Sequence, residues 1–326
     1  MKKILALLLA LWIPAAVLSG CAPQDDSAAS NKLNIVTTIF PAYDWVREIL
    51  GDETDRAEIT MLLDSGVDLH SYQPTVDDIV KISDCDLFLY VGGESDGWVE
   101  DALKNAPNKE RKVIRLLDVL GDSAKAEETV AGMQEEEHDH EEEAEYDEHI
   151  WLSLKNAQVL VAAISEALLE TDPARKDAYA ANAAAYAEKL SALDGEYRAA
   201  VDSGKYKTLL FGDRFPFRYL ADDYRLDYYA AFPGCSAETE ASFETVSFLA
   251  GKMDALGLPC VLTIEGTQHK IAETIVQNTA QKNQQVLTMD SMQAVTANDA
   301  ASGVSYLSIM EKNLSVLKKA LGQEAE

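Results

Sequence analysis

Five histidines are the side chains of this sequence best suited to bind a transition metal ion. His70 in DLHSYQP and His149 in DEHIWLSL lie in short segments at the ends of predicted elements, where ligands usually lie. A neutral imidazole suits a borderline divalent ion. His70 and His149 are therefore candidate metal ligands, with two hydrogen-bonded structural histidines as the alternative. We expect His269, in EGTQHK, to be structural or on the surface.

The two remaining histidines, His138 and His140, lie in the acidic run EEEHDHEEEAEYDEH (135–149). Because like charges at this density repel one another, we predict a mobile surface loop over residues 122–148. Many carboxylates with few imidazoles would bind cations weakly and exchange them quickly. The residues alone leave two interpretations open, a weak cation-collecting site and a solvated acidic run that has no function.

Composition narrows the choice of partner. The chain of 326 residues has 28 Lys+Arg against 56 Asp+Glu, a formal net charge of -28. This charge disfavours nucleic acid and acidic membrane surfaces as partners and favours cations. A mean hydropathy of -0.14 excludes a polytopic membrane protein. The length predicts about two domains.

The first 20 residues have the features of a secretory signal peptide. Lys2 and Lys3 precede an apolar run, Ile4 to Leu18, that is too short to span a membrane. The run ends in LSGC, which resembles the lipobox of bacterial lipoproteins, in which the cysteine becomes the lipidated first residue. We therefore predict that Cys21 is lipidated, that residues 21–32 form a flexible tether, and that the protein lies on the extracellular face of the cell membrane.

Both halves of the chain alternate short β-rich runs with longer helical patterns. This alternation predicts a parallel sheet flanked by helices in each half, 33–152 and 205–326. The expected strands are 34–38, 59–63, 87–93 and 112–117, then 208–212, 227–232, 260–264 and 285–290.

Residues 153–204 carry almost no strand signal. They predict two linking helices, one that ends before Pro173 and one that runs from Pro173 to Gly204, about 45 Å long. The fold class is therefore α/β, with two similar lobes joined by a long rigid backbone helix. Because ligands of parallel sheets bind beyond the carboxyl ends of the strands, we place the metal site in the cleft between the lobes.

Four stretches resemble one protein family. DLHSYQPTVDD is similar to the HxYxPxxxD signature of zinc/manganese ABC-transporter substrate-binding proteins, and DEHIWLSL to their DxHxWLsP stretch, with Leu154 where the family often has Pro. NIVTTIFPAYDWVREI and ISDCDLFLYVGGESDGWVEDAL resemble further segments of that family. The likeness covers nearly all of residues 33–320. Because zinc-type members of the family carry similar His- and acid-rich loops beside the first site, the resemblance implies that His138 and His140 form an accessory metal loop.

The resemblance implies a site of four ligands. His70 and His149 match the first two, and Asp290, in VLTMDSM, matches the fourth. Arg214 stands where the family has its third ligand, but a guanidinium cannot ligate a metal. Asp213 beside it can supply the carboxylate, and Arg214 can hold a neighbouring acid instead. Cys235, Glu240, Glu265 and water are the other candidates for the third position.

The remaining cysteines are Cys85, Cys235 and Cys260. Cys85, in ISDCDLFLY, stands at the predicted entrance of a buried strand, and we expect it to be a small buried hydrophobic residue. Because export permits disulfides, we predict a bond between Cys235 and Cys260, with two buried thiols as the alternative.

The resemblance implies a lipoprotein that captures a divalent metal, Zn²⁺ before Mn²⁺, and delivers it as a monomer to an ABC permease. The ligand types alone do not choose between the two metals. A secreted zinc hydrolase is a weaker hypothesis because no HExxH or GxSxG motif is present, and we predict no enzyme activity. An adhesin has no repeat or stalk to support it.

Overall fold

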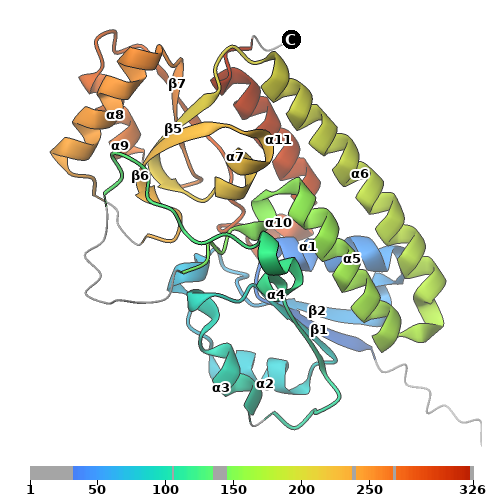
Figure 1. The fold of residues 1–326 in the computed structure, drawn as a ribbon. Helices are drawn as coiled ribbons and strands as arrows, with labels where there is room; N and C mark the ends of the chain where they lie inside the picture. Colours follow the sequence, from blue (N-terminus) through green and yellow to red (C-terminus); the bar gives the residue numbers. More distant parts are fainter. Residues whose placement is uncertain (1–31, 105, 135–144, 237–239, 267–268, 324–326) are drawn as a thin grey trace, which may run out of the picture. The chain divides into compact units, whose positions relative to one another are not determined.

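The computed structural model describes residues 32–104, 106–134, 145–236, 240–266 and 269–323 (Figure 1). Cys21, His138 and His140 lie outside these residues. None of the helices in the described ranges is long and apolar enough to cross a membrane.

The first half contains a sheet of four parallel strands in the order β2-β1-β3-β4. The two inner strands are apolar, as expected for a sheet covered on both faces, and Ile35 and Phe88 are fully buried. The strands are β1 (Leu33–Thr37), β2 (Ala57–Met61), β3 (Leu87–Tyr90) and β4 (Lys112–Arg115).

The helices of this half are α1 (Phe40–Leu50), α2 (Val76–Asp84), α3 (Val99–Lys104) and α4 (Leu116–Leu120). Thr75 caps α2 as predicted, in a capping box with Asp78. The predicted fourth strand, 112–117, is too long by two residues. Leu116, Leu117 and Leu120 are spaced to bury one face of a helix, so the chain leaves the strand at Arg115.

The second half repeats the topology with the order β6-β5-β7-β8, again fully parallel. This repetition confirms the predicted fold of two similar lobes. Its strands are β5 (Thr208–Phe215), β6 (Asp227–Pro233), β7 (Cys260–Thr263) and β8 (Gln285–Thr288). Its helices are α7 (Arg218–Tyr224), α8 (Phe243–Leu256), α9 (Lys270–Asn278), α10 (Ala297–Ala301) and α11 (Tyr306–Ala320).

Two helices link the halves, α5 (Leu154–Thr171) and α6 (Lys176–Ser203). Pro173 begins a short 3-10 turn just before α6 rather than α6 itself. With 28 residues, α6 is about 42 Å long. It packs against α5, against α1 of the first half and against α11 of the second half (Figure 1). The long helix therefore contacts elements of both halves.

The core also crosses between the halves. One hydrophobic cluster contains buried residues of both, and Trp45 of α1 meets Tyr306 of α11 edge to face at 5.2 Å. The indole of Trp151 donates to the carbonyl of Ser291 at 2.8 Å, and Tyr306 Oη donates to the carbonyl of Trp151 at 2.7 Å. These contacts oppose wide opening of one half against the other.

The prediction of a mobile loop over 122–148 is wrong for its described parts. Residues 124–134, which we call the strap, run along the second half, where Lys125 N donates to Tyr219 Oη at 2.9 Å and Gln134 N to the carbonyl of Ala231 at 2.9 Å. Arg218 donates to the carbonyl of Ala126. Backbone and aromatic partners therefore hold the strap despite its neighbouring acidic charge.

Candidate metal centre

A short 3-10 turn after β2 positions His70. Asp68 caps this turn by accepting the backbone N–H of His70 at 3.0 Å, and Leu69 is buried beneath it. The ring atom Nδ1 lies 2.9 Å from Ser95 Oγ and 3.4 Å from Glu148 Oε2. These partners hold Nδ1 and leave Nε2 to face His149.

His149 lies immediately before a buried 3-10 turn, Ile150–Leu152, that leads into α5. Its side chain is fully buried. Asp147 Oδ1 accepts the backbone N–H of His149 at 2.8 Å and lies 2.9 Å from its Nδ1. A carboxylate that accepts the Nδ1 proton fixes the tautomer in which Nε2 carries a free lone pair, which is the usual arrangement of a metal-binding histidine.

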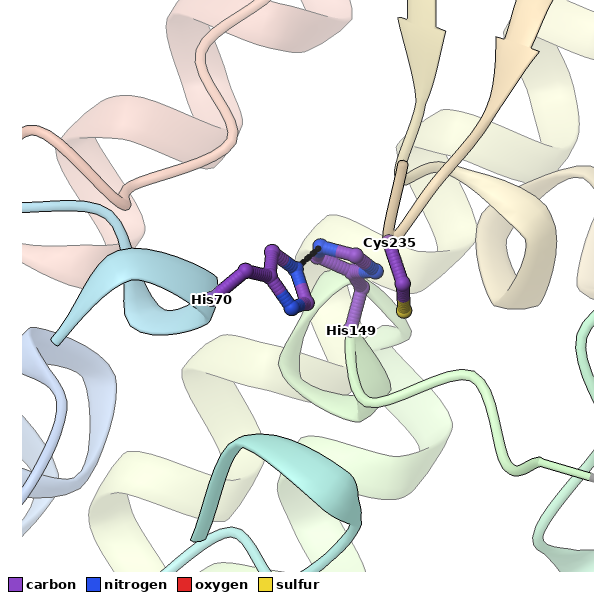
Figure 2. Close-up of side chains that lie close together, drawn as sticks. All are labelled: His70, His149 and Cys235. Atoms are coloured by element: carbon purple, nitrogen blue, oxygen red, sulfur yellow. Dashed lines mark hydrogen bonds between the residues drawn. The ribbon is translucent and has the colours of Figure 1, made fainter. Parts of the chain in front are cut away.

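The two imidazoles face one another through these Nε2 atoms, which are 3.2 Å apart (Figure 2). Two nitrogens bound to one tetrahedral zinc ion at 2.0–2.1 Å would be separated by roughly 3.3 Å. Burial, and then the neighbouring His149, lower the pKa of His70 well below its usual range, so this imidazole is neutral and able to ligate. The pair therefore has the spacing that a shared metal ion requires, and His70 has the protonation state.

Cys235 is the third member of the group. It follows β6 in the second half, and its Sγ and the two imidazoles offer ligand atoms within 4.8 Å of one another. Figure 2 shows Cys235 beside His149, on the side away from His70. In the described part of the chain, this is the only group of three or more His, Cys, Asp or Glu side chains arranged to hold a metal ion.

The predicted disulfide between Cys235 and Cys260 is wrong, because both are free thiols. Cys260 is buried at the start of β7, whereas Cys235 follows β6 at the metal centre. The sequence suggested that these two cysteines could pair, but Cys235 lies beside His149 at the metal centre instead (Figure 2).

The predicted carboxylates Asp213 and Asp290 lie outside this group. Asp213 accepts backbone N–H groups from Arg214 at 2.9 Å and from Ile264 at 3.3 Å. Asp290 accepts the N–H of Met292 at 2.7 Å, and burial followed by the charge of Glu265 raises its pKa. Both stand at the carboxyl ends of strands of the second sheet, and their role as ligands stays a prediction.

Arg214 holds a neighbouring acid, as the sequence suggested. Its Nη2 donates to Asp68 Oδ2 at 2.6 Å, and its Nη1 donates to the carbonyl of Ser236 at 3.3 Å. Because Asp68 also caps the turn that carries His70, the guanidinium links that turn to the segment that carries Cys235.

Sequence reasoning missed the residues that orient the histidines: Ser95, Asp147 and Glu148. The adjacent acids in DEH were a usable signal, because a carboxylate commonly accepts the second N–H of a ligating imidazole. Ser95 had no such signal, since only the fold brings it to His70. His269, expected to be structural or exposed, lies just before α9 and outside the metal-binding group.

Comparison with known proteins agrees with this fold. The model of the ZnuA family, described as zinc-uptake complex component A, periplasmic, matches residues 35–320. The chain belongs to this family.

Two curated relatives and one solved structure illustrate the likeness. The zinc-binding lipoprotein AdcA of Streptococcus pneumoniae is 33% identical over 99% of this chain, which spans 62% of the length of that relative. The high-affinity zinc uptake system protein ZnuA of Bacillus subtilis is 29% identical, over 89% of this chain and 88% of its own length. The Zn(II)-bound ZnuA-like domain of Streptococcus pneumoniae AdcA superposes with a TM-score of 0.69 at 29% identity, covering 90% of this chain and all of that domain.

Proposed function

We propose that this protein captures a divalent transition metal ion, Zn²⁺ before Mn²⁺, as the substrate-binding component of an ABC importer. The observation that carries the proposal is a pair of imidazoles, the half-buried His70 and the buried His149, whose Nε2 atoms face one another at 3.2 Å. Membership of the ZnuA family and the zinc-binding names of its relatives support the same cargo. The role is transport and not catalysis.

The delivery route follows from the family. The protein releases its ion to a permease, and we propose that it does so as a monomer anchored by an acyl-modified Cys21 on the extracellular face of the cell membrane. The relatives named as lipoproteins support this location. We propose that His138 and His140 form an accessory loop that raises the local cation concentration.

Manganese is the second candidate cargo. It prefers more oxygen ligands than zinc does, and Asp213 and Asp290 would supply them if they reach the ion. Competition between the two ions for the purified protein separates these cases. Tighter binding of Mn²⁺ than of Zn²⁺ would keep the proposed transport role and change the cargo.

The test combines metal analysis with competition titration of the purified protein and of the His70→Ala/His149→Ala variant. We expect one tightly held zinc ion per chain and its loss in the double variant. His269→Ala is the matched control, because it removes an imidazole outside the metal-binding group and should keep the ion. Equal binding by the wild type and the double variant would overturn the proposal.

A further inference from the structure

We propose that the sulfur of Cys235 is the third metal donor, so that this chain binds its cargo through a centre of two histidines and one cysteine. The proposal rests on the proposed function and specifies its ligand set. It gives Cys235 the role that sequence reasoning assigned to Asp213. A carboxylate such as Asp290, or a water molecule, is left for the fourth position.

Distance is the first argument. In a tetrahedral zinc centre with Zn–N bonds of 2.0–2.1 Å and a Zn–S bond of 2.3 Å, nitrogen and sulfur lie roughly 3.5 Å apart. The Sγ of Cys235 and one ring nitrogen of each histidine all lie within 4.8 Å of one another. Side-chain rotations that shorten these separations by on the order of 1 Å would bring the three donors to bonding distance.

The chain before Cys235 is shaped for this approach. Gly234 is buried, and a Cβ added there would lie 3.2 Å from His149 Nδ1 and 2.9 Å from the carbonyl oxygen of Phe215. A side chain at position 234 would therefore push the segment away from the imidazole. Glycine allows the backbone to pass directly against His149 and places the thiol beside it.

Neighbouring groups then hold the segment in place. The backbone N–H of Cys235 donates to Glu127 Oε1 of the strap at 2.7 Å, and Arg214 holds the carbonyl of Ser236. Glu127 reaches across from a segment that precedes His149 in the chain. The position of the sulfur relative to the histidines is thus supported from both halves.

The other described cysteines lack this setting. Cys85 Sγ donates to the carbonyl of Ile82 at 3.2 Å in the first half, and Cys260 lies buried in β7. Neither belongs to the metal-binding group. Packing alone therefore accounts for Cys85 and Cys260, whereas Cys235 belongs to one group with two metal-type ligands.

A thiolate ligand predicts which class of metal ion the centre prefers. Binding breaks the S–H bond of Cys235, forms a sulfur–metal bond and releases the proton to solvent. A thiolate favours borderline and soft ions such as Zn²⁺ and Cd²⁺, and it disfavours the harder Mn²⁺. The centre should therefore discriminate against manganese more strongly than a set of histidines and carboxylates does.

Loading the protein with cobalt(II) in place of zinc tests directly whether the sulfur of Cys235 is a metal ligand. We expect the cobalt-loaded wild type to show sulfur-to-cobalt charge transfer in the near ultraviolet, and Cys235→Ser and Cys235→Ala to lose it. Cys260→Ala, which removes a thiol outside the metal-binding group, should keep the band. Absence of the band in a wild type that holds one cobalt ion would overturn the proposal.

Zinc competition supplies the second measurement. Loss of an outer carboxylate or hydroxyl partner of a metal ligand costs roughly 10–100-fold in affinity, so loss of a direct ligand should cost about 100-fold or more. The preference for Zn²⁺ over Mn²⁺ should fall in the same variants. Equal unfolding midpoints of the metal-free proteins would show that the fold is retained.

These experiments distinguish failure of the inference about sulfur from failure of the proposed function. If the Cys235 variants keep wild-type affinity and selectivity while the His70/His149 variant loses zinc, the inference about sulfur is wrong and the proposed function stands. If the wild type holds no metal ion, both are wrong.

Discussion

At the scale of the single residue, the carboxylate of Asp147 orients the imidazole of His149 to bind a metal ion. Because this carboxylate orients Nδ1, we expect Asp147→Asn to weaken zinc binding roughly 10–100-fold without changing the fold. Competition titration measures the change. Asp101→Asn is the control, since Asp101 is an exposed partner of Lys104 on α3. Equal affinity in Asp147→Asn and wild type would show that the carboxylate has no orienting role.

Asp44 gives a prediction about stability. Its side chain is 3% exposed and accepts the N–H of Tyr306 at 2.8 Å, and burial raises its pKa to about 6. The native state therefore holds a proton that the unfolded chain loses near pH 4, so wild-type stability falls as the pH rises from about 4 to 6.

Asp44→Asn keeps an acceptor for Tyr306 without the buried charge. Two pKa units correspond to about 2–3 kcal/mol, so we expect the variant to be more stable by about that amount at pH 7.5 and by little near pH 4. Urea unfolding of the metal-free proteins at both pH values measures this. A stability difference independent of pH would contradict the assigned protonation.

Local sequence predicted His70 and His149 because each stands in a short polar segment beside apolar elements. It named Cys235 only as one of several candidates for the third ligand. That thiol reaches the histidines only because β6 ends at the same edge of the molecule and Gly234 lets the chain approach, and both are consequences of tertiary packing.

At the scale of the element, the acidic segment divides into parts with different roles. Residues 145–147 pair with the strap and carry Asp147, whereas 135–144 lie outside the described residues. We expect replacement of 135–144 by a Gly/Ser sequence of equal length to preserve one tight zinc site. Extending the replacement to 135–147 should weaken it, because Asp147 is lost.

Titration of these two replacements against the wild type separates the roles. If 135–144 were required for tight binding, the first replacement would lose the site, and the accessory role proposed for His138 and His140 would be wrong.

Gly195 tests the long linking helix. It is exposed in the interior of α6, and an added Cβ would meet no atom within 4 Å. Alanine restricts the unfolded chain and favours the helix, so we expect Gly195→Ala to raise the free energy of unfolding by about 0.5–1 kcal/mol. Gly212→Ala is the contrast, because its Cβ would lie 2.6 Å from the Cα of Ala272 in α9.

Denaturant unfolding measures both variants. We expect the free energy of unfolding to rise in Gly195→Ala and to fall in Gly212→Ala. Destabilisation by Gly195→Ala would indicate that α6 is not a regular helix at that position.

Elements with a strong local pattern were predictable, and the others were not. The apolar strands and the long Ala-rich helix need no knowledge of their neighbours. The strap has a loop-like, acidic sequence, yet Tyr219 and Arg218 bind its backbone. Its order comes from partners in the other half of the chain, which no local pattern reveals.

At the scale of the whole molecule, the halves are joined at several places besides the linking helices. Ser65 pairs with Thr296 in an isolated bridge, Ala297 N donates to the carbonyl of Asp64 at 2.8 Å, and Arg214 binds Asp68 across the metal centre. Together with the shared core, these contacts favour capture of the ion by local rearrangement over wide closure.

We therefore expect zinc loading to leave the radius of gyration in small-angle scattering unchanged within error. Hydrogen exchange should slow only near the ligands, at residues 68–72, 147–152 and 233–236. The Arg214→Ala variant should exchange faster at 68–72, because Asp68 loses its partner, while α5 and α6 keep wild-type protection. A clear fall in the radius of gyration on metal binding, or slowed exchange throughout both sheets, would instead mean that the halves close around the ion as rigid bodies.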